Sequence, residues 1–307
     1  AGLTFPKLSS RAISSACGTA DFVETFCRVD LDADEVRRIS EETGGVFSWT
    51  GATDLGPAGD HFITVQRPLG IDPRPQLLAS IMSKKVAVGA TDLVMDIPMG
   101  SESKVPTLED AKAYARDLMD LGDKLGIRVE CAITYAKQPL GEAVGPILEA
   151  RECMEVLERV PGHEDVIDKA CICAGTILSM GGVRDGVGKA REILESGLAH
   201  EKFLEIVAAQ GGKPDISSKD MVPGSHSAEI RAERSGFVRS LSNKAVVAVA
   251  KAAGAPSDKG AGVVLGKKLG MKVSEGDVLM TIYAEREDKL GHAVDVALER
   301  EPIGIEG

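Results

Sequence analysis

Short apolar segments with strand character alternate with longer helical segments over the first two thirds of this 307-residue chain. Residues 92–97 and 127–134 are the clearest strands, because each is a short, mostly apolar run that ends at turn-forming or charged residues. Residues 76–90, residues 185–209 and the segment after Thr107 instead space their apolar residues along one face of a helix. This alternation predicts an α/β core with a mainly parallel sheet flanked by helices.

The character of the sequence changes after a linker of Gly, Lys and Pro at residues 211–214. Beyond it, glycines and charged turns separate short strand segments at residues 228–232, 236–241 and 278–283. We therefore predict two domains, an α/β core over residues 1–211 and a smaller α+β domain over residues 212–307.

The composition excludes several classes of protein. A formal net charge of −11 argues against nucleic-acid binding, which needs a basic surface. No apolar run approaches the roughly 20 residues of a membrane-spanning helix, so we expect no membrane partner. The five His and six Cys residues form no HExxH or CxxC motif, which argues against a zinc site and favours a reducing cytoplasm as the location.

Residues 9–21 are rich in small hydroxyl residues and follow a short apolar segment. A turn of such residues can direct backbone N–H groups and hydroxyls at one point, which makes an anion-binding cradle. The alternative is a solvated turn or a helix cap, because Ser and Thr favour both. The candidate substrate-binding residues of this segment are Ser9, Ser10, Arg11, Ala12, Ile13, Ser14, Ser15 and Thr19.

Three further motifs follow this segment: residues 71–85 (IDPRPQLLASIMSKK), 92–106 (DLVMDIPMGSESKVP) and 138–152 (QPLGEAVGPILEARE). Together with residues 9–21, and in this order and spacing, they resemble the thymidine/pyrimidine-nucleoside phosphorylase family, and within it the archaeal AMP phosphorylase branch. The resemblance extends from about Gly2 to the C-terminus. It implies a nucleoside phosphorylase/phosphoribosyltransferase-like core with a hammerhead-like C-terminal domain.

The resemblance also implies a glycosyltransferase activity. The expected reaction is the reversible phosphorolysis of nucleoside 5′-monophosphates, of AMP and also of CMP and UMP, to the free base and ribose 1,5-bisphosphate. The expected partners are small-molecule substrates and further copies of the chain, in a homodimer or larger homo-oligomer, with no cofactor required beyond inorganic phosphate.

Two alternative functions stay open at this point. One is a thymidine or pyrimidine-nucleoside phosphorylase, which needs no contact to a 5′-phosphate. The other is an inactive nucleotide-binding fragment, because the chain opens without Met and its sequence lacks the family's Lys-His-Ser-x-Gly-Gly phosphate loop. We expect this chain to be a fragment of a longer enzyme.

Asp72 is the candidate proton donor to the leaving base. It precedes Pro73 on a turn whose backbone the proline restricts, and the resemblance assigns proton donation to the carboxyl of this Ile-Asp-Pro motif. Proton delivery by a positioned group is typically worth ~10²–10⁴-fold in rate. The alternative role is an Asx turn or an N-cap ahead of the following helix.

Ser80 and Lys84 are candidate residues for binding the base. They lie four residues apart on the predicted 76–90 helix, so they share one helix face. The resemblance directs this face at the base and its carbonyl group. Lys85 points elsewhere and is expected to be a solvated charge.

Lys104 is the candidate residue for binding a 5′-phosphate. It stands where the bacterial pattern of the family carries Phe, and Ser14 and Ser15 stand where that pattern carries Gly-His. An added cation with added hydroxyl donors is what a second phosphate group requires. The alternative is that Lys104 is a surface lysine of a flexible loop.

Glu152, with the backbone carbonyls of Leu140 and Ala143, matches by resemblance a monovalent-cation site, for which potassium is the candidate ion. The remaining ligands of that site are expected from a segment that precedes this chain. The alternative is a Glu152 on a helix face that pairs with a neighbouring Arg.

Overall fold

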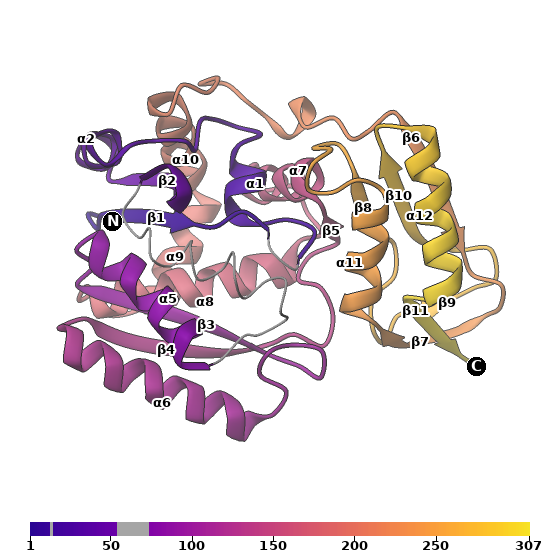
Figure 1. Ribbon diagram of the computed structural model, residues 1–307, viewed down its shortest axis with the longest axis horizontal. Coiled ribbons are helices and arrows are strands. Elements are labelled where there is room, and N and C mark those ends of the chain that lie inside the picture. The colour runs from indigo at the N-terminus through magenta and orange to yellow at the C-terminus, as the bar shows by residue number, and fades with distance from the viewer. Residues whose placement is uncertain (13–14, 54–73) are drawn as a thin grey trace.

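The structure, a computed structural model, describes residues 1–12, 15–53 and 74–307. It shows a mixed α/β fold, as the sequence predicts. Figure 1 shows two parts side by side, an α/β part from the first two thirds of the chain and a smaller C-terminal part from the last third. The two chain ends lie on opposite sides of this view.

The α/β part contains two pairs of parallel strands. β1 (Phe5–Ser9) pairs with β2 (Gly45–Trp49), and β3 (Asp92–Met99) pairs with β4 (Arg128–Tyr135). The strands predicted at residues 92–97 and 127–134 are thus confirmed. The surrounding helices are α1 (Thr19–Val23), α2 (Ala33–Thr43), α3 (Thr50–Thr53), α5 (Arg74–Ala87), α6 (Leu108–Leu125), α7 (Pro146–Leu157), α8 (Glu164–Met180), α9 (Gly186–Glu195) and α10 (Leu198–Ala209).

The C-terminal part contains two antiparallel sheets. One has the strand order β5 (Ala143–Val144), β8 (Gly262–Leu265), β10 (Val278–Ala284) and β6 (His226–Arg231). The other has the order β11 (Ile303–Glu306), β7 (Gly236–Leu241) and β9 (Lys272–Val273). The 3-10 helix η1 (Ser218–Asp220) comes directly before β6 in the chain, and α11 (Asn243–Ala252) and α12 (Glu287–Arg300) pack with the first of these sheets. Because β5 comes from the first 211 residues, the C-terminal sheet ties the two parts together.

Local signals set the ends of the helices. Thr107 caps α6 as predicted, because its Oγ1 accepts a hydrogen bond from the Asp110 N–H at 3.1 Å. The helical stretch predicted over residues 185–209 is two helices, α9 and α10. Gly197 separates them with a left-handed φ of 85°, which interrupts the helix.

The apolar residues form several cores. One core fills the C-terminal part around Val246, Val263 and Ile282, and Ala16 from the loop after β1 is buried in it. Another core packs α6 against the β3–β4 pair through Leu118. In the described parts of the chain, none of the helices combines the length and the apolar character that crossing a bilayer requires.

Candidate functional site

The loop after β1 is closed by the carboxylate of Asp21. This residue lies in α1 with 3% of its surface exposed, and its Oδ2 accepts the N–H groups of Ala12 at 2.7 Å and Gly18 at 3.0 Å. Gly18 permits this closure, because a Cβ atom there would lie 2.7 Å from the Ala12 nitrogen. One side chain therefore holds both ends of the loop. Ile13 and Ser14, two candidate residues within the loop, lie outside the described residues.

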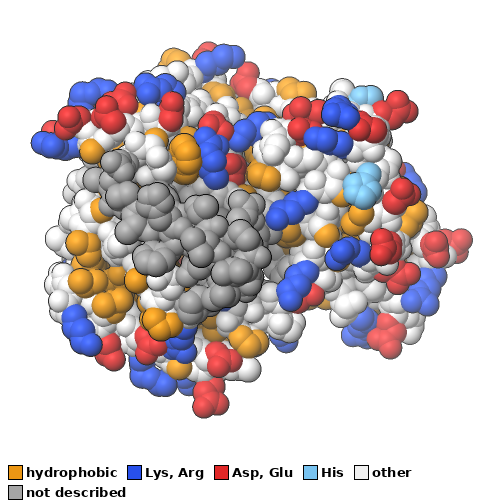
Figure 2. Space-filling model, viewed as in Figure 1, with side chains coloured by type: hydrophobic (Ala, Val, Ile, Leu, Met, Phe, Trp, Pro, Cys, Tyr) orange, Lys and Arg blue, Asp and Glu red, His pale blue; other side chains and the backbone are white. Residues whose placement is uncertain are grey.

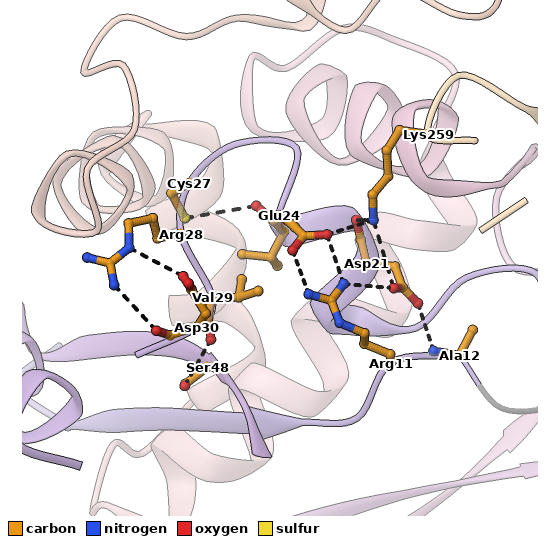
Figure 3. Close-up of polar contacts among 11 residues, drawn as sticks. Arg11, Ala12, Asp21, Glu24, Cys27, Arg28, Val29, Asp30, Ser48 and Lys259 are labelled. Carbon is orange, nitrogen blue, oxygen red and sulfur yellow. Dashed lines mark hydrogen bonds and ion pairs between the residues drawn. The ribbon is translucent and has the colours of Figure 1, made fainter. Parts of the chain in front are cut away.

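Arg11 of this loop points at carboxylates of the chain itself (Figure 3). Its guanidinium donates to the two carboxylate oxygens of Glu24 at 2.5 and 2.8 Å and to Asp21 Oδ1 at 3.3 Å, and it lies 4.8 Å from the Trp49 ring. The hydrogen bonds between them raise the pKa of Arg11 and lower the pKa of Glu24 to about 2. Arg11 is thus part of an internal ion-pair cluster, and its contact with a substrate stays a prediction.

Three lysines gather near the end of β1. Lys84 Nζ lies 3.2 Å from Ser10 Oγ, so the structure brings two candidate binding residues together, and Ser80 is half-buried one turn earlier on α5. The expectation that Lys85 is solvated is wrong, because it is half-buried. Burial and the charges of Lys7 and Lys84 lower the pKa of Lys85 to about 8. Cations crowded in this way favour an anionic ligand.

The other predicted residues divide between described and undescribed segments. Asp72, the predicted proton donor, lies outside the described residues. Ser9 ends β1, Ser15 is exposed, and Thr19 begins α1. Their roles, like that of Asp72, stay predictions.

The loop after β3, which carries the exposed Lys104, is tied to the C-terminal part by Glu102. The Glu102 carboxylate accepts hydrogen bonds from Ser242 Oγ at 2.8 Å and from the Lys244 N–H at 2.9 Å. Both donors belong to the N-terminal end of α11, which Ser242 caps, and such helix ends favour carboxylates. Figure 2 shows Lys and Arg side chains gathered on this face between the α/β part and the C-terminal part. The contact of Lys104 with a 5′-phosphate stays a prediction.

The predicted cation ligands lie in a loop beside the Glu152 carboxylate. Glu152 Oε1 accepts the Glu142 N–H at 2.7 Å and lies 3.5 Å from His163 Nδ1, and burial raises the pKa of Glu152. The predicted set of one carboxylate and the carbonyls of Leu140 and Ala143 consists of oxygen ligands, which suit a hard cation. Burial disfavours the ionised form of this half-buried carboxylate, and a bound cation would stabilise that form.

A lysine of the C-terminal part reaches the same loop. Lys268 is 7% exposed, and its Nζ donates to the Gly141 carbonyl at 2.8 Å and pairs with Asp165 Oδ2 at 2.5 Å. A cavity of about 190 Å³ lies beside Glu152 and extends to Tyr283. Among the residues that the structure describes, no group of three or more His, Cys, Asp or Glu side chains is arranged to hold a metal ion.

The alternative for Glu152 was an ion pair with a neighbouring Arg, but the neighbouring Arg151 pairs with another acid. Arg151 pairs with Glu155 at 3.4 Å, one helical turn further along α7. The contacts of Glu152 described above are instead to a backbone N–H and to His163.

The sequence analysis missed a half-buried acid at the start of α7, Glu149, and the nearby thiol of Cys17 in the loop after β1. Glu149 Oε1 accepts the Gly145 N–H at 3.0 Å, and burial raises the pKa of Glu149 to about 7. Burial and the nearby Glu149 also raise the pKa of the Cys17 thiol. Since a thiolate is the reactive form of Cys, this raised pKa disfavours the reactive form of Cys17.

The acidic partners of the loop after β1 were also missed. Asp21 is the last residue of the hydroxyl-rich segment that contains Arg11, and Glu24 lies three residues further along the chain. An acid pair at this spacing beside an arginine is a signal that could have found them. Lys259 completes the group, and its separation of 238 residues from Asp21 left no signal in the sequence.

Two family models match the chain. The model described as "Glycosyl transferase family, a/b domain" matches residues 1–200, and the model described as "Pyrimidine nucleoside phosphorylase C-terminal domain" matches residues 237–303. The chain belongs to this glycosyl transferase family. The resemblance inferred from the four motifs is confirmed by these matches and by the relatives that follow.

The curated relatives that match are longer than this chain. The "AMP phosphorylase" of Pyrococcus abyssi is 52% identical over 310 residues, which is 100% of this chain and 62% of the relative. The "AMP phosphorylase" of Methanosarcina barkeri is 50% identical over 309 residues, and "AMP phosphorylase 1" of Archaeoglobus fulgidus is 47% identical over 308 residues. In both cases the match covers 100% of this chain and 61% of the relative.

Proposed function

We propose that this chain forms the larger part of an enzyme that catalyses the reversible phosphorolysis of nucleoside 5′-monophosphates. AMP is the main substrate, with CMP and UMP as further substrates, and the products are the free base and ribose 1,5-bisphosphate. The observation that carries the proposal is the sequence identity of about 50% between this chain, over its whole length, and proteins named AMP phosphorylase. The cations near the end of β1 support it, since both substrates carry phosphate.

The reaction requires that the two phosphate groups are held, that positive charge on the ribose is tolerated, and that the leaving base receives a proton. In the proposed site, the loop of residues 9–19 and Lys104 bind the 5′-phosphate. Ser80 and Lys84 bind the base, and Asp72 gives it the proton. Lys84 is already held beside Ser10, so base and phosphate contacts would share one region.

Several finer points belong to the same proposal. The two parallel strand pairs would be parts of one mainly parallel sheet, and the C-terminal part would be the hammerhead-like domain, divided near residue 211. Glu152 with the carbonyls of Leu140 and Ala143 would hold a potassium ion, which supplies positive charge to that loop. The enzyme would act as a homodimer or larger homo-oligomer, without nucleic-acid or membrane partners, and its six free cysteines fit a reducing cytoplasm.

The experiment measures release of the free base from AMP, adenosine and thymidine by the full-length protein in the presence of phosphate. We expect turnover of AMP with a much higher kcat/KM than of either nucleoside. Turnover of thymidine without AMP would instead support a pyrimidine-nucleoside phosphorylase. Turnover of none of the three would support a nucleotide-binding protein without this activity.

Lys104→Ala tests the 5′-phosphate contact in the same assay. A charge-assisted contact to phosphate is typically worth ~1.5–3 kcal/mol, so kcat/KM for AMP should fall about ten- to a hundredfold. The kcat/KM for adenosine, which lacks the phosphate, should be almost unaffected. The control Lys112→Ala, on the exposed face of α6, should leave kcat/KM unchanged for both substrates. An equal fall for AMP and adenosine would contradict the assignment.

A further inference from the structure

We propose that Lys259 of the C-terminal part is a positioning residue for the two described ends of the candidate substrate loop after β1, at Ala12 and Gly18. The expected effect of Lys259 on substrate binding rests on the proposed function, whereas its expected effect on the order of the loop is independent of that function. The C-terminal part would then be a working component of the substrate site and not only an attached domain.

The ammonium group of Lys259 completes a cluster of two cations and two carboxylates. Its Nζ lies 2.8 Å from Glu24 Oε2, 3.4 Å from the Asp21 carbonyl and 3.9 Å from Asp21 Oδ1. Figure 3 shows Arg11, Asp21, Glu24 and Lys259 pointing toward one another. Since Arg11 supplies one positive charge, Lys259 is the second charge that balances the two acids.

The turn that carries Lys259 is fixed on both sides. The Lys259 carbonyl accepts the N–H of Ile147, next to the start of α7, at 3.0 Å. The N–H of Gly260 donates to Glu285 at 2.8 Å, and the Gly260 carbonyl accepts the Gly224 N–H at 2.8 Å. The ammonium group is therefore presented from an ordered turn, so little conformational freedom remains to be lost when it binds the acids.

Two other contacts join the C-terminal part to the candidate substrate loops. Ala16, within the loop after β1, is 1% exposed and packs in the core of the C-terminal part. Glu102, in the loop that carries Lys104, binds the first turn of α11 through Ser242 and the Lys244 N–H. The same part of the molecule thus contacts both segments to which the proposed function assigns the 5′-phosphate.

Loss of Lys259 should loosen the loop through Asp21. Without the second cation, Asp21 and Glu24 share Arg11 alone, and one carboxylate charge is left uncompensated in a partly buried position. Asp21 is also the acceptor for the N–H groups of Ala12 and Gly18. A displaced Asp21 therefore releases the two ends of the loop.

Hydrogen exchange of the full-length protein tests the loop directly and needs no activity. In Lys259→Met, the amides of Ala12 and Gly18 should exchange roughly tenfold faster than in the wild type, because local opening becomes easier. Lys259→Arg, which can still pair with Glu24, should restore slow exchange. Lys272→Met, at an exposed lysine of the same part, should leave the exchange unchanged.

Steady-state kinetics test the consequence for the substrate. Lys259→Met should raise KM for AMP roughly tenfold relative to Lys272→Met, with a much smaller change in KM for inorganic phosphate. In Lys259→Arg, the KM for AMP should return most of the way to the wild-type value.

The outcomes separate this proposal from the proposed function. If the full-length protein does not convert AMP, the proposed function fails, and the exchange of Ala12 and Gly18 still decides whether Lys259 orders the loop. Unchanged exchange at these two amides in Lys259→Met would overturn the positioning role. Equally faster exchange across the whole C-terminal core would also overturn it, because Lys259 would then only stabilise that part.

Discussion

The loop after β1 and the start of α7 each bring two acids into a partly buried position, but in opposite electrostatic states. In the first region, Arg11 and Lys259 reach the carboxylates, and the pKa of Glu24 falls to about 2. In the second region, burial dominates, and it raises the pKa of Glu149 to about 7 and also the pKa of Glu152.

The difference follows from which cations reach each region. Lys268 comes close to the second region, but its ammonium group is used by the Gly141 carbonyl and by Asp165. Glu24 of the first region therefore favours the ionised form, whereas burial favours the protonated form of Glu149 and Glu152 in the second region. The same residue type thus has a lowered or a raised pKa according to the nearby charges and its burial.

The largest expected effect comes from breaking the first region with Asp21→Ala. The substitution leaves Arg11 without one of its acids and leaves the Ala12 and Gly18 N–H groups without their acceptor. A partly buried N–H group left without its acceptor typically costs about 1–3 kcal/mol in the free energy of unfolding, and here two N–H groups lose theirs. Urea unfolding measures the loss.

The matched control for Asp21→Ala is Asp30→Ala, at an exposed acid that pairs with Arg28 at 3.3 Å. Because exposed pairs are worth little, this variant should lose less than about 1 kcal/mol. Equal losses in the two variants would mean that burial of Asp21 confers no special role.

Glu149→Gln tests the second region. The folded pKa of about 7 lies above the ordinary 4.5, so the folded state binds more protons than the unfolded state between these values, and stability falls as the pH rises through this window. Gln stays neutral and can still accept the Gly145 N–H. The variant should match the wild type near pH 4.5 and exceed it by at most about 3 kcal/mol above pH 7. Urea unfolding at several pH values measures this; identical profiles would contradict the raised pKa.

Potassium tests whether the second region takes a cation. In the full-length protein, potassium chloride should stabilise the fold by about 1 kcal/mol over N-methylglucamine chloride at equal ionic strength, when potassium exceeds its Kd several-fold. Glu152→Gln should abolish this difference, and Glu164→Gln, at an exposed acid of α8, should preserve it. Thermal unfolding measures the shift. The same potassium effect in both variants would place the ion elsewhere.

The smallest expected effect is that of Glu24→Gln. The folded pKa of about 2 lies below the ordinary 4.5, so the ionised group stabilises the fold above pH 4.5, and this contribution is lost as the pH falls toward 2. The side chain is 34% exposed, so solvent screens its ion pairs and the loss near pH 7 should stay below about 1 kcal/mol. The two proteins should converge at acidic pH in unfolding experiments, and a constant difference would show that shape, not charge, matters.

Much of the fold followed from local patterns. The strands β3 and β4 and the cap of α6 agree with the sequence because apolar runs and capping residues act within a few residues of the chain. The stretch predicted to be helical over residues 185–209 is divided into two helices, because Gly197 takes a left-handed conformation that periodicity alone does not reveal.

By itself the sequence determined the α/β fold class, the family, and the segments in which candidate binding residues lie, since these depend on order and spacing along the chain. The tertiary structure alone decided which charges meet. It placed Lys84 beside Ser10 and left Lys85 half-buried. It also brought Lys259 to Asp21, from which it is separated by 238 residues in the sequence. The physical reason is that ion pairs and desolvation depend on distances in space and on exclusion of water, and neither quantity is encoded in the spacing of residues along the chain.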